Sequence, residues 1–184
     1  MEVLEINSHT FFKKWQEISL LQNEILCSNW DQTGNFTSCI FTNEISMVKS
    51  MAREFGLNCT FNYYSLDAVF FTDNDLVPGI PISNTWLRNI RIAFEHENSF
   101  SSGLFQEVSH LLITKCDLRV LVTYPDNNLE WEKKRLHDLI LGADAAKKIS
   151  DKSSFLLIFG SKTNEAIVKW EAFVFKLNGW VSLY

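Results

Sequence analysis

Two glutamates, Glu95 and Glu97, stand one residue apart at the end of an apolar stretch that runs from Asn89 to Asn98. The preceding residues alternate in type as they do in a buried strand, so both carboxylates should point to the same side. Two like charges that lie close together repel, unless a cation or hydrogen bonds neutralise them. The pair therefore indicates a divalent-metal site. The alternative is a strand that has reached solvent and turned polar.

A third carboxylate, Asp67, opens the apolar run 67–72, 28 positions before Glu95. The runs 57–64 and 67–72 are separated by too few residues for a helix, which favours an antiparallel hairpin. Neighbouring antiparallel strands place the start of one beside the end of the next. We therefore expect Asp67 to meet the glutamate pair at one edge of the sheet, where a cluster of carboxylates suits Mg²⁺ or Mn²⁺.

The remaining chain reads as further helices and strands of an α/β protein. The continuous apolar run 118–124 is typical of the middle of a sheet that is covered on both faces. A helix precedes it, and the strand–helix–strand order predicts a right-handed parallel crossover. The sequence thus predicts one domain, 1–184, with a mixed central sheet flanked by helices. Expected helices span 9–27, 43–55, 104–114 and 129–149; expected strands span 57–64, 67–72, 90–97, 118–124, 155–159, 169–177 and 180–184.

The helix expected over 43–55 carries another acid, Glu44, in its first turn. Thr42 or Asn43 could cap this helix, and Gly56 could end it. An acid in the first turn is also favourable because it interacts with the helix dipole. The polar stretch 29–38 and the segments 73–86 and 99–103 read as loops.

Composition excludes several classes of protein. The 184 residues are 46% hydrophobic, which provides for a real core, yet no apolar run is long enough to cross a membrane. The N-terminus lacks a basic region followed by an apolar one, so a cytoplasmic protein is expected. The four cysteines are scattered without zinc-ligand spacing, which favours free thiols. The net charge of −5 argues against a constitutive non-specific DNA binder but allows a local basic groove.

The element order from about Asn43 to Tyr124, together with Asp67 and Glu95-His96-Glu97, resembles the PD-(D/E)xK nuclease superfamily, which has the restriction-endonuclease-like fold. Asp67 matches the first acid of the family motif and Glu95 the second. Glu97 stands where the family usually has lysine, and some type II restriction enzymes have Glu-x-Glu there. Glu44 stands where many members carry an auxiliary acid.

The resemblance implies a metal-dependent endonuclease that hydrolyses DNA phosphodiester bonds, of a restriction-like or repair type, and that acts as a homodimer. Asp67 and Glu95 would hold Mg²⁺ or Mn²⁺, with the backbone carbonyl of His96 as a further ligand. Glu97 would accept a proton from water or bind a second ion. Glu44 would assist through a water molecule.

Other polar residues have simpler interpretations. We expect His96 to be packed or at the surface, Lys115 to end a helix, and Glu107 and His110 to face solvent. Basic side chains that could contact DNA phosphates are Arg88, Arg91, Lys133, Lys134 and Arg135.

Two other functions stay open at this point. The chain could be a catalytically inactive member of the same fold that binds nucleic acid or protein. It could also be an unrelated α/β protein, such as an immunity or anti-defence partner that docks through acidic and aromatic surface.

Overall fold

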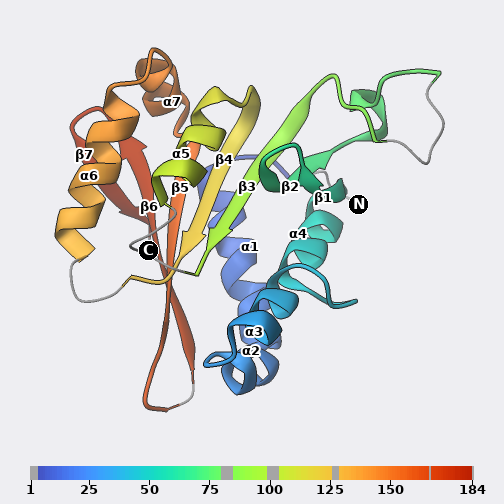
Figure 1. The fold of residues 1–184 in the computed structure, drawn as a ribbon, viewed down its shortest axis with the longest axis vertical. Helices are drawn as coiled ribbons and strands as arrows, with labels where there is room; N and C mark the ends of the chain where they lie inside the picture. Colours follow the sequence, from blue (N-terminus) through green and yellow to red (C-terminus); the bar gives the residue numbers. More distant parts are fainter. Residues whose placement is uncertain (1–3, 80–84, 99–103, 126–128, 166, 184) are drawn as a thin grey trace.

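A seven-stranded sheet, in which the strands lie in the order of the sequence, forms the centre of the computed structural model (Figure 1). The structure describes residues 4–79, 85–98, 104–125, 129–165 and 167–183. The loop 99–103, part of the loop 73–86 and Tyr184 of the last expected strand lie outside these ranges. The strands are β1 (Asn58–Tyr63), β2 (Leu66–Phe71), β3 (Ile90–Glu97), β4 (Cys116–Thr123), β5 (Phe155–Lys162), β6 (Val168–Lys176) and β7 (Gly179–Leu183).

The sheet is mixed. β1, β2 and β3 pair antiparallel, β3, β4 and β5 pair parallel, and β6 and β7 continue antiparallel. The parallel pairs need crossover connections, which the helices between β3 and β5 supply. These pairings confirm the α/β class, the mixed sheet and the parallel crossover into the strand over 118–124.

Helices cover both faces of the sheet, in two layers with separate cores. The first layer comprises α1 (Ser8–Leu21), α2 (Asn23–Asn29), α3 (Thr33–Ile40) and α4 (Met47–Phe55). The second comprises α5 (Leu104–Ile113), α6 (Leu129–Leu141) and α7 (Ala146–Lys152). Side chains of β3 alternate between the layers, as a strand requires: Ile92 and Phe94 pack with the first, and Ala93 packs with the second.

The first layer departs from the expected pattern at its helix ends. The helix expected over 9–27 breaks at Gln22, and Leu21, at the end of α1, is 87% exposed. The stretch 29–38, expected to be a loop, contains most of α3. These polar residues form a helix because Phe36 and Cys39 are buried against the core on one side of it.

The helix expected over 43–55 begins later than predicted. Ser46 caps α4 by accepting a hydrogen bond from the backbone N–H of Lys49, and Gly56 ends it in the left-handed conformation. Capping by Thr42 or Asn43 was therefore wrong, whereas the end at Gly56 is confirmed. Glu44 consequently lies in a turn before the helix.

The helix expected over 129–149 is two helices, α6 and α7. The break contains Gly142, a residue that is unfavourable inside a helix. Among the described residues, no helix has the length and apolar character needed to cross a bilayer.

Candidate metal centre

Hydrogen bonds join Asp67, at the start of β2, to the end of β3, where Glu95 lies. Ala68 faces Phe94 in the β2–β3 register, so the next residues along bring Asp67 opposite Glu95. The backbone N–H of Asp67 donates to Oε2 of Glu95 at 3.1 Å, and the N–H of His96 donates to Oδ2 of Asp67 at 2.8 Å. The expected meeting of Asp67 with the acidic end of the next strand is confirmed.

Both side chains face the second helical layer. Asp67 shares its side of β2 with Val69, and Glu95 shares its side of β3 with Ala93. The helix that covers this part of the sheet is α5, which follows β3 directly in the chain. The chemistry of the acidic pair therefore depends on what α5 places over it.

α5 brings an acid and an imidazole, Glu107 and His110, onto Glu95. Nδ1 of His110 lies 3.3 Å from Oε1 of Glu95 and 3.5 Å from Oε2 of Glu107. Each of the two helical side chains is only 19% exposed. The expectation that both residues face solvent was wrong.

A signal for these residues is present in the sequence. Leu104, Val108 and Leu111 form the apolar stripe of α5 and are buried. Glu107 stands three residues after Leu104 and thus lies on that inward stripe, and His110 lies one turn beyond Glu107 on the same side. An acid on an inward stripe indicates a buried polar partner, which here is Glu95.

Burial dominates the electrostatics of the cluster. Glu95 is 0% exposed, and burial, with the nearby charge of Asp67, raises the pKa of its carboxyl to about 10. Burial is also the main cause of the raised pKa of both Asp67 and Glu107. Several acids with raised pKa values in one place are the condition that a bound cation would relieve.

Glu97 lies at the partly exposed rim of the same cluster. Burial is the largest cause of the raised pKa of Asp67 and of Glu107, and the charge of Glu97 is a smaller cause of both. The carboxylate of Glu97 is therefore near these two acids. Its backbone carbonyl accepts a hydrogen bond from the hydroxyl of Thr123 at 2.8 Å, which fixes the end of β3 to β4. Glu97 is therefore the most accessible acid on β3.

Glu44 is not part of this arrangement. It is exposed, and its backbone carbonyl accepts a hydrogen bond from Arg53 at 2.9 Å. It precedes α4, whose layer covers the face of the sheet opposite to the one that Asp67 and Glu95 face. The fold thus separates it from the acid cluster.

The side chains of His96 and Lys115 also lie away from the cluster. His96 is 8% exposed, and its Nε2 lies 2.8 Å from the hydroxyl oxygen of Tyr124, as expected of a packed histidine. Burial lowers the pKa of its imidazole to about 3, so it is neutral at pH 7. Lys115 precedes β4 at the other end of the sheet, where Ile90 pairs with Cys116.

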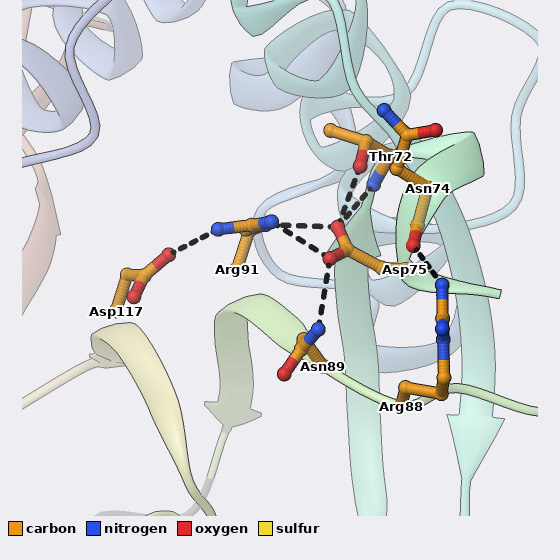
Figure 2. A network of polar contacts seen from close by, with 7 residues as sticks. All are labelled: Thr72, Asn74, Asp75, Arg88, Asn89, Arg91 and Asp117. Carbon is orange, nitrogen blue, oxygen red and sulfur yellow. Dashed lines mark hydrogen bonds and ion pairs between the residues drawn. The ribbon is translucent and has the colours of Figure 1, made fainter.

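Two of the arginines expected to contact DNA are engaged elsewhere (Figure 2). Arg91 donates to both carboxylate oxygens of the buried Asp75, at 2.8 and 2.7 Å, and also pairs with Asp117 at 3.3 Å. Arg88 donates to the backbone carbonyl of Asn74 at 2.7 Å. Both arginines lie at the start of β3, the end remote from Glu95.

The donor set of the cluster is suited to a transition-metal dication. One ligand atom from each of Glu95, Glu107 and His110 lies within 4.8 Å of the other two. Carboxylate oxygens favour Mg²⁺ and Mn²⁺, whereas an imidazole nitrogen favours later transition metals, so the mixed set favours Mn²⁺ over Mg²⁺. Relative to the expected pair of Asp67 and Glu95, the geometry keeps Glu95 and adds two candidate ligands from α5, Glu107 and His110.

Comparisons with known proteins identify no relative: no family model, no curated protein and no solved structure matches this chain.

Proposed function

We infer that the protein is a metal-dependent nuclease that hydrolyses DNA phosphodiester bonds and has a restriction-endonuclease-like core. The observation that carries this proposal is the meeting of Asp67, Glu95, Glu107 and His110 at the point where β2 begins and β3 ends. The order α4–β1–β2–β3–α5–β4 is the element order that the resemblance implies and supports the same proposal.

The residues divide into ligands and positioning groups. Glu95, Glu107 and His110 would hold the cation. When bound, the metal polarises a phosphate oxygen and lowers the pKa of a water molecule. Asp67, whose carboxylate accepts a hydrogen bond from the N–H of His96, holds Glu95 in place because its own backbone N–H donates to Oε2 of Glu95. Glu97, at the rim, is placed to take the proton from the water.

An aromatic and basic surface on α5 and α6 is the site that we assign to a DNA strand. The guanidinium of Arg135 lies 4.3 Å from the ring centre of Phe105 and 4.2 Å from that of Trp131. Phe105 is two residues from Glu107 on α5, and the two rings are 38% and 52% exposed. Exposed aromatic rings beside a cation are typical platforms for stacking of single-stranded bases.

Cleavage of a supercoiled plasmid with Mn²⁺ or Mg²⁺ tests this function. Glu107→Gln and Glu95→Gln should abolish nicking, because each removes a charged ligand. Glu44→Gln, an equivalent change at an acid on the other face of the sheet, should leave nicking unchanged. Loss of activity in Glu44→Gln with retention in Glu107→Gln would contradict the site assigned here.

The inactive alternative has one observation in its favour. Glu95 already has hydrogen-bonding partners within the chain, at Asp67 and His110, so the cluster can persist without an ion. Binding of Mn²⁺ without any plasmid cleavage would favour a binding module of the same fold.

A further inference from the structure

A cavity lies at the other end of the sheet from the acid cluster. It has a volume of about 480 Å³ and lies between the starts of β3 and β4, the end of α5 and helix α7. Ile90 lines it, and at about 3.3 Å per residue the five steps along β3 to Glu95 span roughly 17 Å. The cavity is therefore distinct from the proposed metal centre.

Cations without carboxylate partners line this cavity, although the protein as a whole is acidic. Lys115, Lys148 and Lys152 are exposed lining residues, and none of them makes a hydrogen bond or ion pair with the part of the chain that the structure describes. The one acid of the lining, Asp117, is paired with Arg91, which Asp75 also neutralises. Like-charged groups that converge on one cavity without counter-charges favour an anion there.

A buried guanidinium, that of Arg119, adds to the same lining. Arg119 is 7% exposed, and it donates through Nε to the carbonyl of Leu111 and through Nη2 to that of Thr114, at 2.8 and 2.7 Å. Its third nitrogen, Nη1, has no hydrogen-bond partner among the described residues. An anion in the cavity that Arg119 lines would give this guanidinium a charge-assisted partner.

Part of the lining is apolar. Leu112, Ile113 and Ile149 form this part, and Ile113 is 84% exposed at the end of α5. A cavity of several hundred cubic ångströms with an apolar wall and a few convergent polar groups is typical of small-molecule sites. Cations on one side and aliphatic groups on another match the two halves of a nucleotide.

We propose that this cavity binds a nucleoside phosphate, with its phosphates on Lys115, Lys148, Lys152 and Arg119 and its base against the aliphatic wall. This site goes beyond the proposed nuclease function and does not depend on it. The acids of the neighbouring segment, Asp144 and Asp151, are not among the lining residues and leave the phosphate side unopposed.

Calorimetric titration of the full chain with ATP, in EDTA so that the metal centre plays no part, tests the proposal. The double variant Lys148→Ala/Lys152→Ala should weaken ATP binding by about tenfold or more, as loss of two charge-assisted contacts requires. Lys147→Ala removes one lysine charge from α7 at a residue that does not line the cavity, and should leave the affinity unchanged. Melting temperatures check that the variants are folded.

Tripolyphosphate separates the two halves of the ligand. Ile113→Ser should weaken ATP binding and leave tripolyphosphate binding unchanged, because the base alone contacts the wall. No ATP binding, equal losses in Lys147→Ala and Lys148→Ala/Lys152→Ala, or tripolyphosphate binding as tight as that of ATP would each overturn the proposal. A single-stranded oligonucleotide that binds more tightly than ATP through the same lysines would overturn it in favour of a DNA contact.

Discussion

Nδ1 of His110 lies 3.3 Å from Oε1 of Glu95, and this contact joins helix α5 to the buried end of strand β3. The same nitrogen lies 3.5 Å from Oε2 of Glu107. The imidazole is thus held between two acids, one of them 0% exposed. A neutral imidazole and two carboxylates in this arrangement can share a dication, whereas without one the acids must stay partly protonated.

Manganese should stabilise the folded protein more than magnesium. A dication at 100 times its dissociation constant adds about 2.7 kcal/mol, which raises the melting temperature of a chain of this size by roughly 5–10 °C. His110→Asn should remove most of the preference for Mn²⁺, because the imidazole nitrogen is the ligand that favours it. Differential scanning fluorimetry with each chloride salt measures the shift.

Glu130→Gln is the matched control for the metal experiment, since Glu130 is an 83% exposed acid on α6. It should leave the Mn²⁺ shift unchanged. An equal shift in the wild-type protein, His110→Asn and Glu107→Gln would show that the ion binds elsewhere.

The metal-free protein should lose stability as the pH rises. The pKa of Glu95 is raised in the fold from 4.5 to about 10, so between these values the folded state binds more protons than the unfolded state. The contribution of Glu95 to the free energy of unfolding is therefore fully present below about pH 4.5. Between that pH and about pH 10 it falls by at most about 1.4 kcal/mol per pH unit for this group. Urea unfolding in EDTA at several pH values measures the slope.

Glu95→Gln should flatten this pH dependence, because a neutral amide of the same shape has no proton to lose. The raised pKa values of Asp67 and Glu107 act in the same direction, so a smaller slope should remain. A slope that is unchanged in Glu95→Gln would mean that Glu95 is ionised throughout the range.

Removal of Arg91 should destabilise the protein because the carboxylate of Asp75 would then be buried without its arginine partner. Asp75 is 1% exposed; although burial raises its pKa, hydrogen bonds from Arg91 and Thr72 hold the pKa well below its usual range. Arg91→Met should cost about 2–3 kcal/mol, less than for a fully buried pair, because the arginine is partly exposed. Urea unfolding at pH 7 measures the loss, and Arg88→Met is the control.

The cost of Arg91→Met should also shrink in acid. A depressed pKa contributes stability that is present above the unfolded value, 3.8, and lost as the pH falls through the folded value. Variant and wild type should therefore approach each other below about pH 4. A constant difference down to pH 2 would mean that packing, not the ion pair, accounts for the effect.

Trp131 should contribute to the binding of single-stranded DNA. Trp131→Ala removes an exposed ring that flanks Arg135, and loss of one stacked base typically costs about 1–3 kcal/mol. Fluorescence anisotropy with a labelled oligonucleotide measures the affinity. Trp86→Ala is the control because Trp86 has similar exposure, 49% against 52%, and follows the loop at the other end of β3. Equal losses in both variants would exclude a defined stacking site.

The meeting of Asp67 on β2 with Glu95 on β3 could be predicted from the sequence. Period-two alternation in β3 and the expected antiparallel pairing of β2 with β3 were sufficient to bring Asp67 to Glu95, because an antiparallel register leaves little freedom. The same reasoning could not place Glu44. Its position depends on where α4 begins, and Ser46, not Thr42 or Asn43, satisfies the first N–H groups of that helix.

The part that α5 contributes was harder to predict. Glu107 and His110 are of the types that line a solvated helical face, and the signal against that interpretation is their spacing from the apolar stripe, which sets the rotation of α5 about its axis. That rotation is fixed by tertiary packing of Leu104, Val108 and Leu111 on the sheet. The break at Gln22 also depends on packing, since the flanking residues have adequate helix propensity, whereas the break between α6 and α7 has a local signal in Gly142.

The most direct test of the metal centre is a crystal structure of the protein soaked in Mn²⁺. The account predicts one ion in anomalous difference density, bonded to carboxylate oxygens of Glu95 and Glu107 and to Nδ1 of His110 at roughly 2.0–2.3 Å. An ion at another place, or no ion while these three side chains keep their separations within 4.8 Å, would contradict it.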